Sequence, residues 1–299
     1  MRPLDWLAIA RPFSFTASIV PVLAGAALAV RDGRFDPVLF VVTLVASVSL
    51  QAGTNVINEI HDVRTGVDRP DSPRASKVLV EGRMSTRAAY GLAAVFFGLT
   101  IGLGLWLTAL RGLPLLLIGL AGVLGGYFYT APPLQYKYRA LGVPLVFVYM
   151  GVLMVVGAYY AIAGQWSDEA IFASLPIGIL VAAILHANDV RDVDEDSRAG
   201  FSTLSIVLKR QRAAWLYVWM VPIAFALTAL LVFARALPWT ALLVFLALPA
   251  GLQAISLMRR SIASGDQSAI ARIDQRTAQV HLLFGLLLAG GIAIAGILR

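Results

Sequence analysis

The chain has 299 residues, of which 59% are hydrophobic and only 14% are charged, and its formal net charge is +7. A typical soluble domain is about 45–50% apolar and about 25% charged, so this composition excludes disorder, a secreted disulfide scaffold and a soluble α/β enzyme. A lipid bilayer must be the solvent for much of the chain. The absence of cysteine excludes thiolate catalysis and cysteine-based metal sites. The basic excess indicates loops beside anionic membrane lipid, and nucleic acid is not expected as a partner.

Nine apolar runs are long enough to cross a membrane as helices, which need about 20 residues each. They lie at about 14–30, 37–58, 87–110, 113–130, 143–163, 169–188, 213–234, 238–258 and 279–298. Only helices and closed barrels satisfy their backbone hydrogen bonds in lipid, and these runs far exceed the roughly ten residues of a barrel strand. The sequence therefore predicts an all-α integral membrane protein, a bundle of about nine transmembrane helices forming a single domain over residues 1–299.

The distribution of Lys and Arg predicts the orientation of this bundle. The connections alternate between basic and nearly neutral, so that 19 of the 24 Lys and Arg residues fall on one side and 5 on the other. Basic loops stay in the cytoplasm. We therefore expect a protein of the cell (inner) membrane, with its N-terminus in the cytoplasm and its C-terminus outside.

Acidic residues are concentrated at two places in the chain. Ten of the 17 lie at 59–81 and 189–196, directly after the second and the sixth apolar runs. Four crossings separate the two clusters, so both emerge on the same, cytoplasmic face. This coarse repeat suggests two four-helix halves, with Asp-rich motifs at 55–68 and 188–200, followed by a ninth helix.

Polar side chains within these motifs recur at helical spacing. Steps of three and four residues place side chains on one face of a helix. The first set is Gln51, Asn55, Asn58 and Asp62, and the second is Asn188, Asp192 and Asp196. Carboxamides inside a span are costly unless they find partners within the bundle, so we expect both sets to face its interior. In the alternative interpretation, the acids solvate loops or pair with Arg64 and Arg191.

Carboxylates gathered on one face raise each other's pKa unless a cation accompanies them. Oxygen ligands suit Mg²⁺, which commonly joins carboxylates to the phosphates of a substrate, and neither Cys nor a His cluster is available for a softer metal. Basic residues on the same side, including Arg64, Lys77, Lys137 and Arg139, complete the expectation of a diphosphate site. Any one of these bases can also be explained by the positive-inside rule alone.

Several segments resemble the UbiA superfamily of intramembrane prenyltransferases. Residues 51–68, QAGTNVINEIHDVRTGVD, resemble its first Asp-rich motif, and residues 188–204, NDVRDVDEDSRAGFSTL, resemble its second. The stretch YTAPPLQYKYR at 129–139 resembles the connection after helix four, and RPFSFTASIVPVLAG resembles the first helix. The likeness covers nearly the whole chain and is greatest to the branch that prenylates 1,4-dihydroxy-2-naphthoate. One departure is Glu59, which stands where the first motif usually has Asp.

The resemblance implies a fold and a reaction. Nine helices surround a central cavity under a cap of cytoplasmic loops, and an allylic polyprenyl diphosphate binds with its head at the Asp-rich motifs. Two Mg²⁺ ions are expected, for which Mn²⁺ can substitute. The allylic C–O bond breaks, and an aromatic acid attacks the carbocation. The chain is thus expected to be a transferase of the EC 2.5.1 class, which prenylates and decarboxylates 1,4-dihydroxy-2-naphthoate in menaquinone biosynthesis.

The resemblance also assigns roles to individual residues. The catalytic carboxylates are Asp62, Asp68, Asp192 and Asp196, which bind metal together with Asn58. The diphosphate ligands are Lys137, Arg139, Tyr129, Arg64 and Lys77, and the acceptor pocket contains Asn55, Asn188, Gln51 and Arg11. Two alternatives remain open: a UbiA-type enzyme for 4-hydroxybenzoate or another acceptor, and a secondary transporter. Transporter sites lie near the midplane on broken helices, whereas these charges gather at helix ends.

Overall fold

The computed structural model describes residues 5–66, 76 and 78–298, and within these ranges the chain is helical without any β-strand. The α-helices are α1 (Asp5–Ala10), α2 (Thr16–Arg31), α3 (Pro37–Arg64), α4 (Thr86–Arg111), α5 (Leu113–Phe128), α6 (Gly142–Val146), α7 (Met154–Ala163), α8 (Asp168–Arg191), α9 (Val193–Arg198), α10 (Leu204–Leu208), α11 (Arg210–Phe233), α12 (Leu248–Ser264) and α13 (Ile273–Ile297). The 3₁₀ segments are η1 (Pro12–Phe15), η2 (Tyr136–Tyr138), η4 (Trp239–Ala247) and η5 (Gln267–Ile270), and η3 (Phe147–Leu153) is π-helical.

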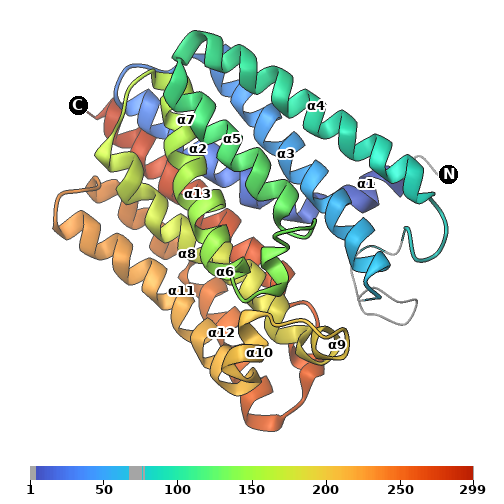
Figure 1. Cartoon of the computed structure of the whole chain (residues 1–299). Helices are drawn as coiled ribbons and strands as arrows, with labels where there is room; N and C mark the ends of the chain where they lie inside the picture. Colours follow the sequence, from blue (N-terminus) through green and yellow to red (C-terminus); the bar gives the residue numbers. More distant parts are fainter. Residues whose placement is uncertain (1–4, 67–75, 77, 299) are drawn as a thin grey trace.

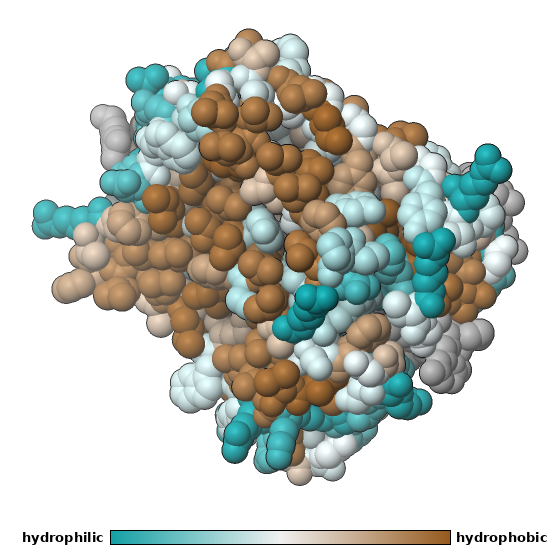
Figure 2. Space-filling model, viewed as in Figure 1, coloured by the Kyte–Doolittle hydropathy of each residue, from teal (hydrophilic) through white to brown (hydrophobic). Residues whose placement is uncertain are grey.

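The predicted all-α membrane bundle is confirmed. In the described ranges, 8 helical stretches are long and apolar enough to cross a membrane, and α5 is a shorter apolar helix of 16 residues. Each of these nine corresponds to one of the predicted apolar runs. Apolar side chains cover much of the face shown in Figure 2, and hydrophilic ones gather mainly toward its margins. Such a surface suits lipid around the middle of the bundle and water at its ends.

Local sequence explains where several helices begin and end. The Asp36 carboxylate accepts hydrogen bonds from the amides of Val38 and Leu39 at 2.8 and 3.0 Å, directly before Pro37 opens α3. An acidic N-cap followed by proline at the first helical position is a typical helix start. A helix end is explained in the same way. α7 ends at Ala163, before Gly164, whose φ of +73° is a left-handed conformation that glycine adopts without strain.

The second apolar run extends further as a helix than hydropathy predicts. The apolar run ends near residue 58, whereas α3 continues to Arg64 and thus through most of the first Asp-rich motif. The extension keeps an apolar side chain buried, that of Ile60, and the helix ends two residues before Gly66, whose φ is +76°. The polar residues of the motif are therefore held on a rigid helix rather than on a loop.

α13 packs along α2 and α8, and it joins the end of the chain to the main core. A Cβ atom added to Gly285 of α13 would lie 2.1 Å from a methyl carbon of Val20 in α2, so only glycine permits this approach. Small residues at such contacts let membrane helices pack closely. This packing brings the start of α13 beside the end of α8.

Both Asp-rich motifs lie at one end of the bundle. Figure 1 shows α9 near the C-terminal end of α3, while the C-terminal end of α13 lies at the opposite end of the molecule. The proximity of the motif ends is also evident from contacts that both make with the segment after α5. The division into two four-helix halves stays a prediction.

Candidate active site

A cavity of about 190 Å³ opens among the helix ends that carry the two motifs. Its lining comes from η1, α3, α5, α8, α13 and the segment after α5, with further residues from α2, α6, η3 and α7. The polar lining residues are Arg11, Ser14, Gln51, Thr54, Asn55, Asn58, Tyr129, Tyr136, Lys137, Tyr149, Asn188 and Asp274. The cavity is thus polar at the end of the bundle where the Asp-rich motifs lie, and we call it the head cavity.

The amide stripe of α3 lies inside the bundle, as predicted from its spacing. The Asn55 amide donates to the backbone oxygen of Ala10 at 2.7 Å and to the Ser14 hydroxyl at 2.8 Å. The Gln51 amide donates to the side-chain oxygen of Asn55 at 3.2 Å. These bonds satisfy buried amides and fix the η1 turn against α3.

The carboxylate of Asp62 lies one turn further along the same face and is fully buried. The ammonium of Lys137 lies 3.0 and 3.1 Å from its two oxygens, and the Tyr138 hydroxyl donates to one of them. Lys137 is itself buried, at 6% exposure. A buried carboxylate is tolerated only when it is paired and hydrogen-bonded, so this lysine neutralises the charge of Asp62.

Arg191, at the end of α8, organises the second motif. Its guanidinium binds both oxygens of Asp192, at 2.7 and 2.9 Å, and donates to the side-chain oxygen of Asn188. Its remaining terminal nitrogen lies 2.9 Å from the carboxylate of Asp274 on α13. Bidentate guanidinium–carboxylate pairs have defined geometry, so Asp192 is held in one orientation.

The segment after α5 and the segment after α9 meet at the end of the bundle that carries the motifs. The Tyr138 ring stacks on the Phe201 ring with a centroid separation of 3.8 Å and an interplanar angle of 16°. The Ser202 amide donates to the backbone oxygen of Tyr138 at 3.2 Å, and the Phe201 amide donates to that of Asp196 at 3.0 Å. The segment after α5 is therefore attached to the segment that follows the second motif.

Tyr136, in the segment after α5, is held in its neutral form. Burial raises the pKa of Tyr136, and the nearby Tyr149 raises it further. The Tyr136 hydroxyl donates to the backbone oxygen of Gly125 at 2.6 Å. Its ring lies edge-on to that of Tyr129, whose own ring is 6.0 Å from the Lys137 ammonium. These aromatic faces form an electron-rich wall beside the lysine.

Not all predicted site residues converge on the head cavity. Arg64 is exposed and donates to the Tyr90 hydroxyl at 2.8 Å, and Arg139 is exposed and donates to the backbone oxygen of Pro133 at 3.0 Å. Neither residue lines the head cavity, and the buried carboxylates Asp62, Asp192 and Asp196 are not part of its lining either. Asp68 and Lys77 lie outside the described residues. The roles predicted for all of the site residues stay predictions.

Two other polar residues near the motifs have structural partners. Glu59 is buried on a different face of α3, where it accepts from the Leu79 amide at 3.2 Å and lies 3.9 Å from Arg11. His186 is buried and contacts the backbone oxygen of Ala213 at 2.8 Å. The departure from the usual motif at Glu59 therefore leaves the Asn58–Asp62 face unchanged.

The donor atoms at this end of the bundle fit a hard divalent cation. Asp62, Asp192 and Asp196 are each at most 2% exposed, and their oxygens are the ligand type that Mg²⁺ prefers. Within the described ranges, no group of three His, Asp or Glu side chains forms a metal cluster. The charges of Asp62 and Asp192 are instead neutralised by Lys137 and Arg191.

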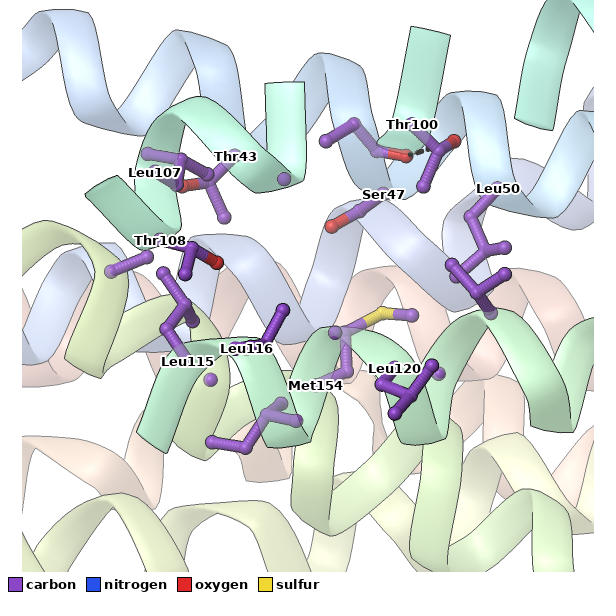
Figure 3. A pocket seen from close by; sticks show the side chains of 18 of the residues that line it. Thr43, Ser47, Leu50, Thr100, Leu107, Thr108, Leu115, Leu116, Leu120 and Met154 are labelled. Carbon is purple, nitrogen blue, oxygen red and sulfur yellow. Dashed lines mark hydrogen bonds between the residues drawn. The ribbon is translucent and has the colours of Figure 1, made fainter. Parts of the chain in front are cut away.

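A second, apolar cavity of about 310 Å³ adjoins the head cavity and lies between α3, α4, α5 and α7. The two share Leu50, Gly122, Tyr149 and Met154 in their linings. Figure 3 shows leucine side chains such as Leu107, Leu115 and Leu120 around it, together with the hydroxyl side chains of Thr43, Ser47, Thr100 and Thr108. We call it the tail cavity. Together the cavities suit an elongated ligand with one polar end.

Sequence analysis missed several residues of this arrangement. The roles of Asp274, Tyr138 and Phe201 had not been predicted, because their partners lie far away in the chain. The separation is 76 residues for Tyr138 and Asp62. Asp274 carried one signal, since it is an isolated acid beside the last apolar run on the side of the other acids.

Comparisons with known proteins agree with this architecture. The model of the UbiA prenyltransferase family matches residues 18–280. The chain is 32% identical over 296 residues to 1,4-dihydroxy-2-naphthoate octaprenyltransferase of Bacillus subtilis, covering 96% of this chain and 91% of that protein. It is 31% identical over 289 residues to human UbiA prenyltransferase domain-containing protein 1, covering 95% of this chain and 82% of that protein.

Solved structures share the fold at lower sequence identity. A UbiA homolog from Archaeoglobus fulgidus bound to GPP and Mg²⁺ superimposes with a TM-score of 0.61 at 19% identity, covering 96% of this chain and 99% of that chain. The apo structure of a UbiA homolog from Aeropyrum pernix K1 gives a TM-score of 0.62 at 18% identity, covering 98% and 99% of the two chains.

Proposed function

This chain belongs to the UbiA prenyltransferase family, as its sequence motifs predicted, and is an integral membrane prenyltransferase; we propose that it transfers a polyprenyl group from an allylic polyprenyl diphosphate to 1,4-dihydroxy-2-naphthoate. The product, after loss of the acceptor's carboxylate as carbon dioxide, is a 2-polyprenyl-1,4-dihydroxynaphthalene, the reduced precursor of a demethylmenaquinone. The acceptor is inferred from the named Bacillus relative and from the motifs at 55–68, 129–139 and 188–204.

The observation that carries the donor proposal is that a polar and an apolar cavity adjoin. Lys137, Asn58 and Asn188 line the polar head cavity, and the apolar tail cavity lies next to it between α3 and α5. A polyprenyl diphosphate has this distribution of polarity. A homolog of the same fold was solved with GPP and Mg²⁺, which supports the choice of donor.

Lys137 receives the diphosphate in this proposal. Its ammonium is a mobile point charge on a flexible stem, and it leaves Asp62 for the phosphate oxygens when the donor binds. Tyr129 lies beside it and presents its ring to the reacting allylic carbon, where an electron-rich face stabilises positive charge. The apolar lining of the tail cavity keeps water away from this carbon.

The described residues that would hold Mg²⁺ are Asn58, Asp62, Asp192 and Asp196. Asp68, which belongs to the first motif, is proposed as a further ligand. When bound, Mg²⁺ neutralises the charge that grows on the departing diphosphate. The chain's own contribution is to bury these oxygens at one end of the bundle and keep them oriented. Arg191 orients Asp192, and the Thr130 hydroxyl orients Asn58 through a hydrogen bond of 2.8 Å.

The acceptor occupies the side of the head cavity formed by η1 and α3. Arg11 lines this side, and its guanidinium can bind the acceptor carboxylate. Gln51, Asn55 and Asn188 offer amides to the ring hydroxyls. The ring carbon that carries the carboxylate attacks the allylic carbon as the C–O bond breaks. Carbon dioxide then leaves, and its bonding electrons restore the aromatic ring.

The orientation in the membrane follows from the charge distribution. We place the enzyme in the inner membrane of the cell. Because 19 of the 24 basic residues belong to the connections on the side of the two motifs, this side and the N-terminus face the cytoplasm. The C-terminal end of α13 then faces outward. Both substrates reach the head cavity from the cytoplasm or from the adjoining lipid leaflet.

The test is an assay of the purified protein with one labelled polyprenyl diphosphate and a panel of acceptors. We expect product from 1,4-dihydroxy-2-naphthoate with added Mg²⁺ and none in excess EDTA. Product from 4-hydroxybenzoate alone would refute the acceptor assignment, and full turnover in EDTA would refute the metal.

Two variants test the carboxylates against a matched control. D62N and D192N should each lower turnover on the order of a hundredfold, as loss of a main electrostatic stabiliser does. Asp194 lies in the second motif, but its side chain is 68% exposed and pairs with Arg210. D194N should keep turnover near that of the wild type. Equal activity of D62N, D192N and wild type would show that the acids only solvate loops.

A further inference from the structure

A contact between two segments far apart in the chain joins the two Asp-rich motifs. We propose that Tyr138, stacked on Phe201, is a positioning residue: its hydroxyl holds Asp62 in place, and its ring and backbone tie Asp62 to the second motif, so that the donor diphosphate meets both motifs as one unit. This inference rests on the proposed use of Asp62 for a diphosphate donor.

The first link of this unit is the contact of Tyr138 with Asp62. Lys137 and Tyr138 are neighbours in the η2 turn, and both reach the same fully buried carboxylate. The two partners differ in charge. The ammonium carries a positive charge that an incoming diphosphate attracts strongly, whereas the neutral phenol carries no net charge. Tyr138 therefore remains the partner that keeps Asp62 oriented after Lys137 has moved.

The second link is the stack of Tyr138 on Phe201. The rings are nearly parallel and 3.8 Å apart, a separation at which the faces are in full contact. Tyr138 is buried at 6% exposure, so its ring has little room to adopt another orientation. Phe201 thus determines where the Tyr138 hydroxyl points.

The third link is the turn after α9. The chain reverses at Gly200, whose φ of +78° is strained for any residue with a side chain. This turn directs the Phe201 amide back to the backbone oxygen of Asp196 at 3.0 Å. The next amide, that of Ser202, reaches the backbone oxygen of Tyr138 at 3.2 Å. The position of the second motif is therefore coupled to that of Asp62.

Paired variants separate the two links. Y138F removes the hydroxyl and keeps the stack, whereas F201L removes the stack and keeps the hydroxyl. Loss of a hydrogen bond to a charged group changes an equilibrium constant by roughly tenfold. Y138F should therefore raise the KM for the polyprenyl diphosphate about tenfold. The KM for the acceptor should not change. F201L should act in the same direction, and F201Y should restore the wild-type value.

The double variant tests whether the two residues act as one unit. If Phe201 works through Tyr138, adding F201L to Y138F should raise the donor KM little further. Y217F is the control, since it removes a buried hydroxyl that bonds Thr277 at 2.7 Å between α11 and α13. The proposal would be overturned if the rise in donor KM of the double variant equalled the product of the rises in the two single variants. Equal rises in the donor KM and the acceptor KM would also overturn it.

Hydrogen exchange provides a readout without turnover. In the purified protein without substrates, F201L should speed exchange at the Ser202 amide, and Y217F should not. Unchanged exchange in F201L would overturn the coupling. A wild-type protein that turns over no prenyl diphosphate would refute the proposed function instead, and the exchange result alone would then decide whether the two segments are coupled.

Discussion

Removing the Lys137 ammonium should expose how much the first motif depends on its counter-charge. The Lys137–Asp62 pair has nitrogen–oxygen distances of 3.0 and 3.1 Å, and the carboxylate is fully buried. Breaking a buried pair by removing one partner costs about 3–5 kcal/mol. The remaining Tyr138 hydroxyl offsets about 1 kcal/mol of this. K137M should therefore lower the free energy of unfolding by about 2–4 kcal/mol.

The assay is thermal unfolding of the purified protein in EDTA and in Mg²⁺. At about 2–4 °C per kcal/mol for a large domain, K137M in EDTA should unfold several degrees below wild type. Mg²⁺ should recover part of this loss, because a cation that binds the folded state stabilises it. K209M, at an exposed lysine, is the control. The double variant D62N/K137M should regain stability, and an equally unstable double variant would refute the charge argument.

Four further outcomes follow from the geometry. R11K keeps the charge but loses the fork of donors, so it should raise the acceptor KM more than the donor KM. R139K, at an exposed arginine, should have the smaller effect, and the reverse order would assign the acceptor carboxylate to Arg139 instead of Arg11. D274N should raise the donor KM and the Mg²⁺ requirement several-fold, because it releases the guanidinium that holds the second motif, and D274E should recover most of the loss. A cysteine at exposed Ser197, in a chain without other cysteines, should be labelled only from the cytoplasm; labelling from outside would invert the topology. Burial raises the pKa of Tyr136, so its neutral form stabilises the fold below pH 10, and this contribution is lost as the pH rises above 10. Y136F should therefore lose less stability than wild type above pH 10. Identical dependence of unfolding stability on pH in the two proteins would contradict the burial argument.

Much of the architecture was accessible from one-dimensional patterns. The length of each apolar run specifies a membrane helix, because the bilayer leaves the backbone few other ways to satisfy its hydrogen bonds. The spacing of Asn55, Asn58 and Asp62 places them on one helix face, and the structure buries that face. These predictions succeed because helix geometry and lipid solvation act on neighbouring residues.

The bases were harder to assign, because a charge in a loop is compatible with many partners. Lys137 and Arg139 are two residues apart in the same segment, and the sequence offered no reason to prefer one. In the structure, Lys137 is buried against Asp62, whereas Arg139 is exposed and bonded to the Pro133 backbone. The η2 turn rotates one side chain inward and the other outward, and hydropathy carries no information about that rotation.

The sequence by itself determined the helices, the emergence of both acidic clusters at the same end of the bundle and the family motifs. Only the tertiary structure decided which partners meet: Lys137 with Asp62 across 75 positions, and Arg191 with Asp274 through the packing of α13 on α8. These pairings depend on close contacts between helices, such as that of Gly285 with Val20. Such contacts arise from the complementary shapes of whole helix surfaces, a property that no local pattern of residues contains.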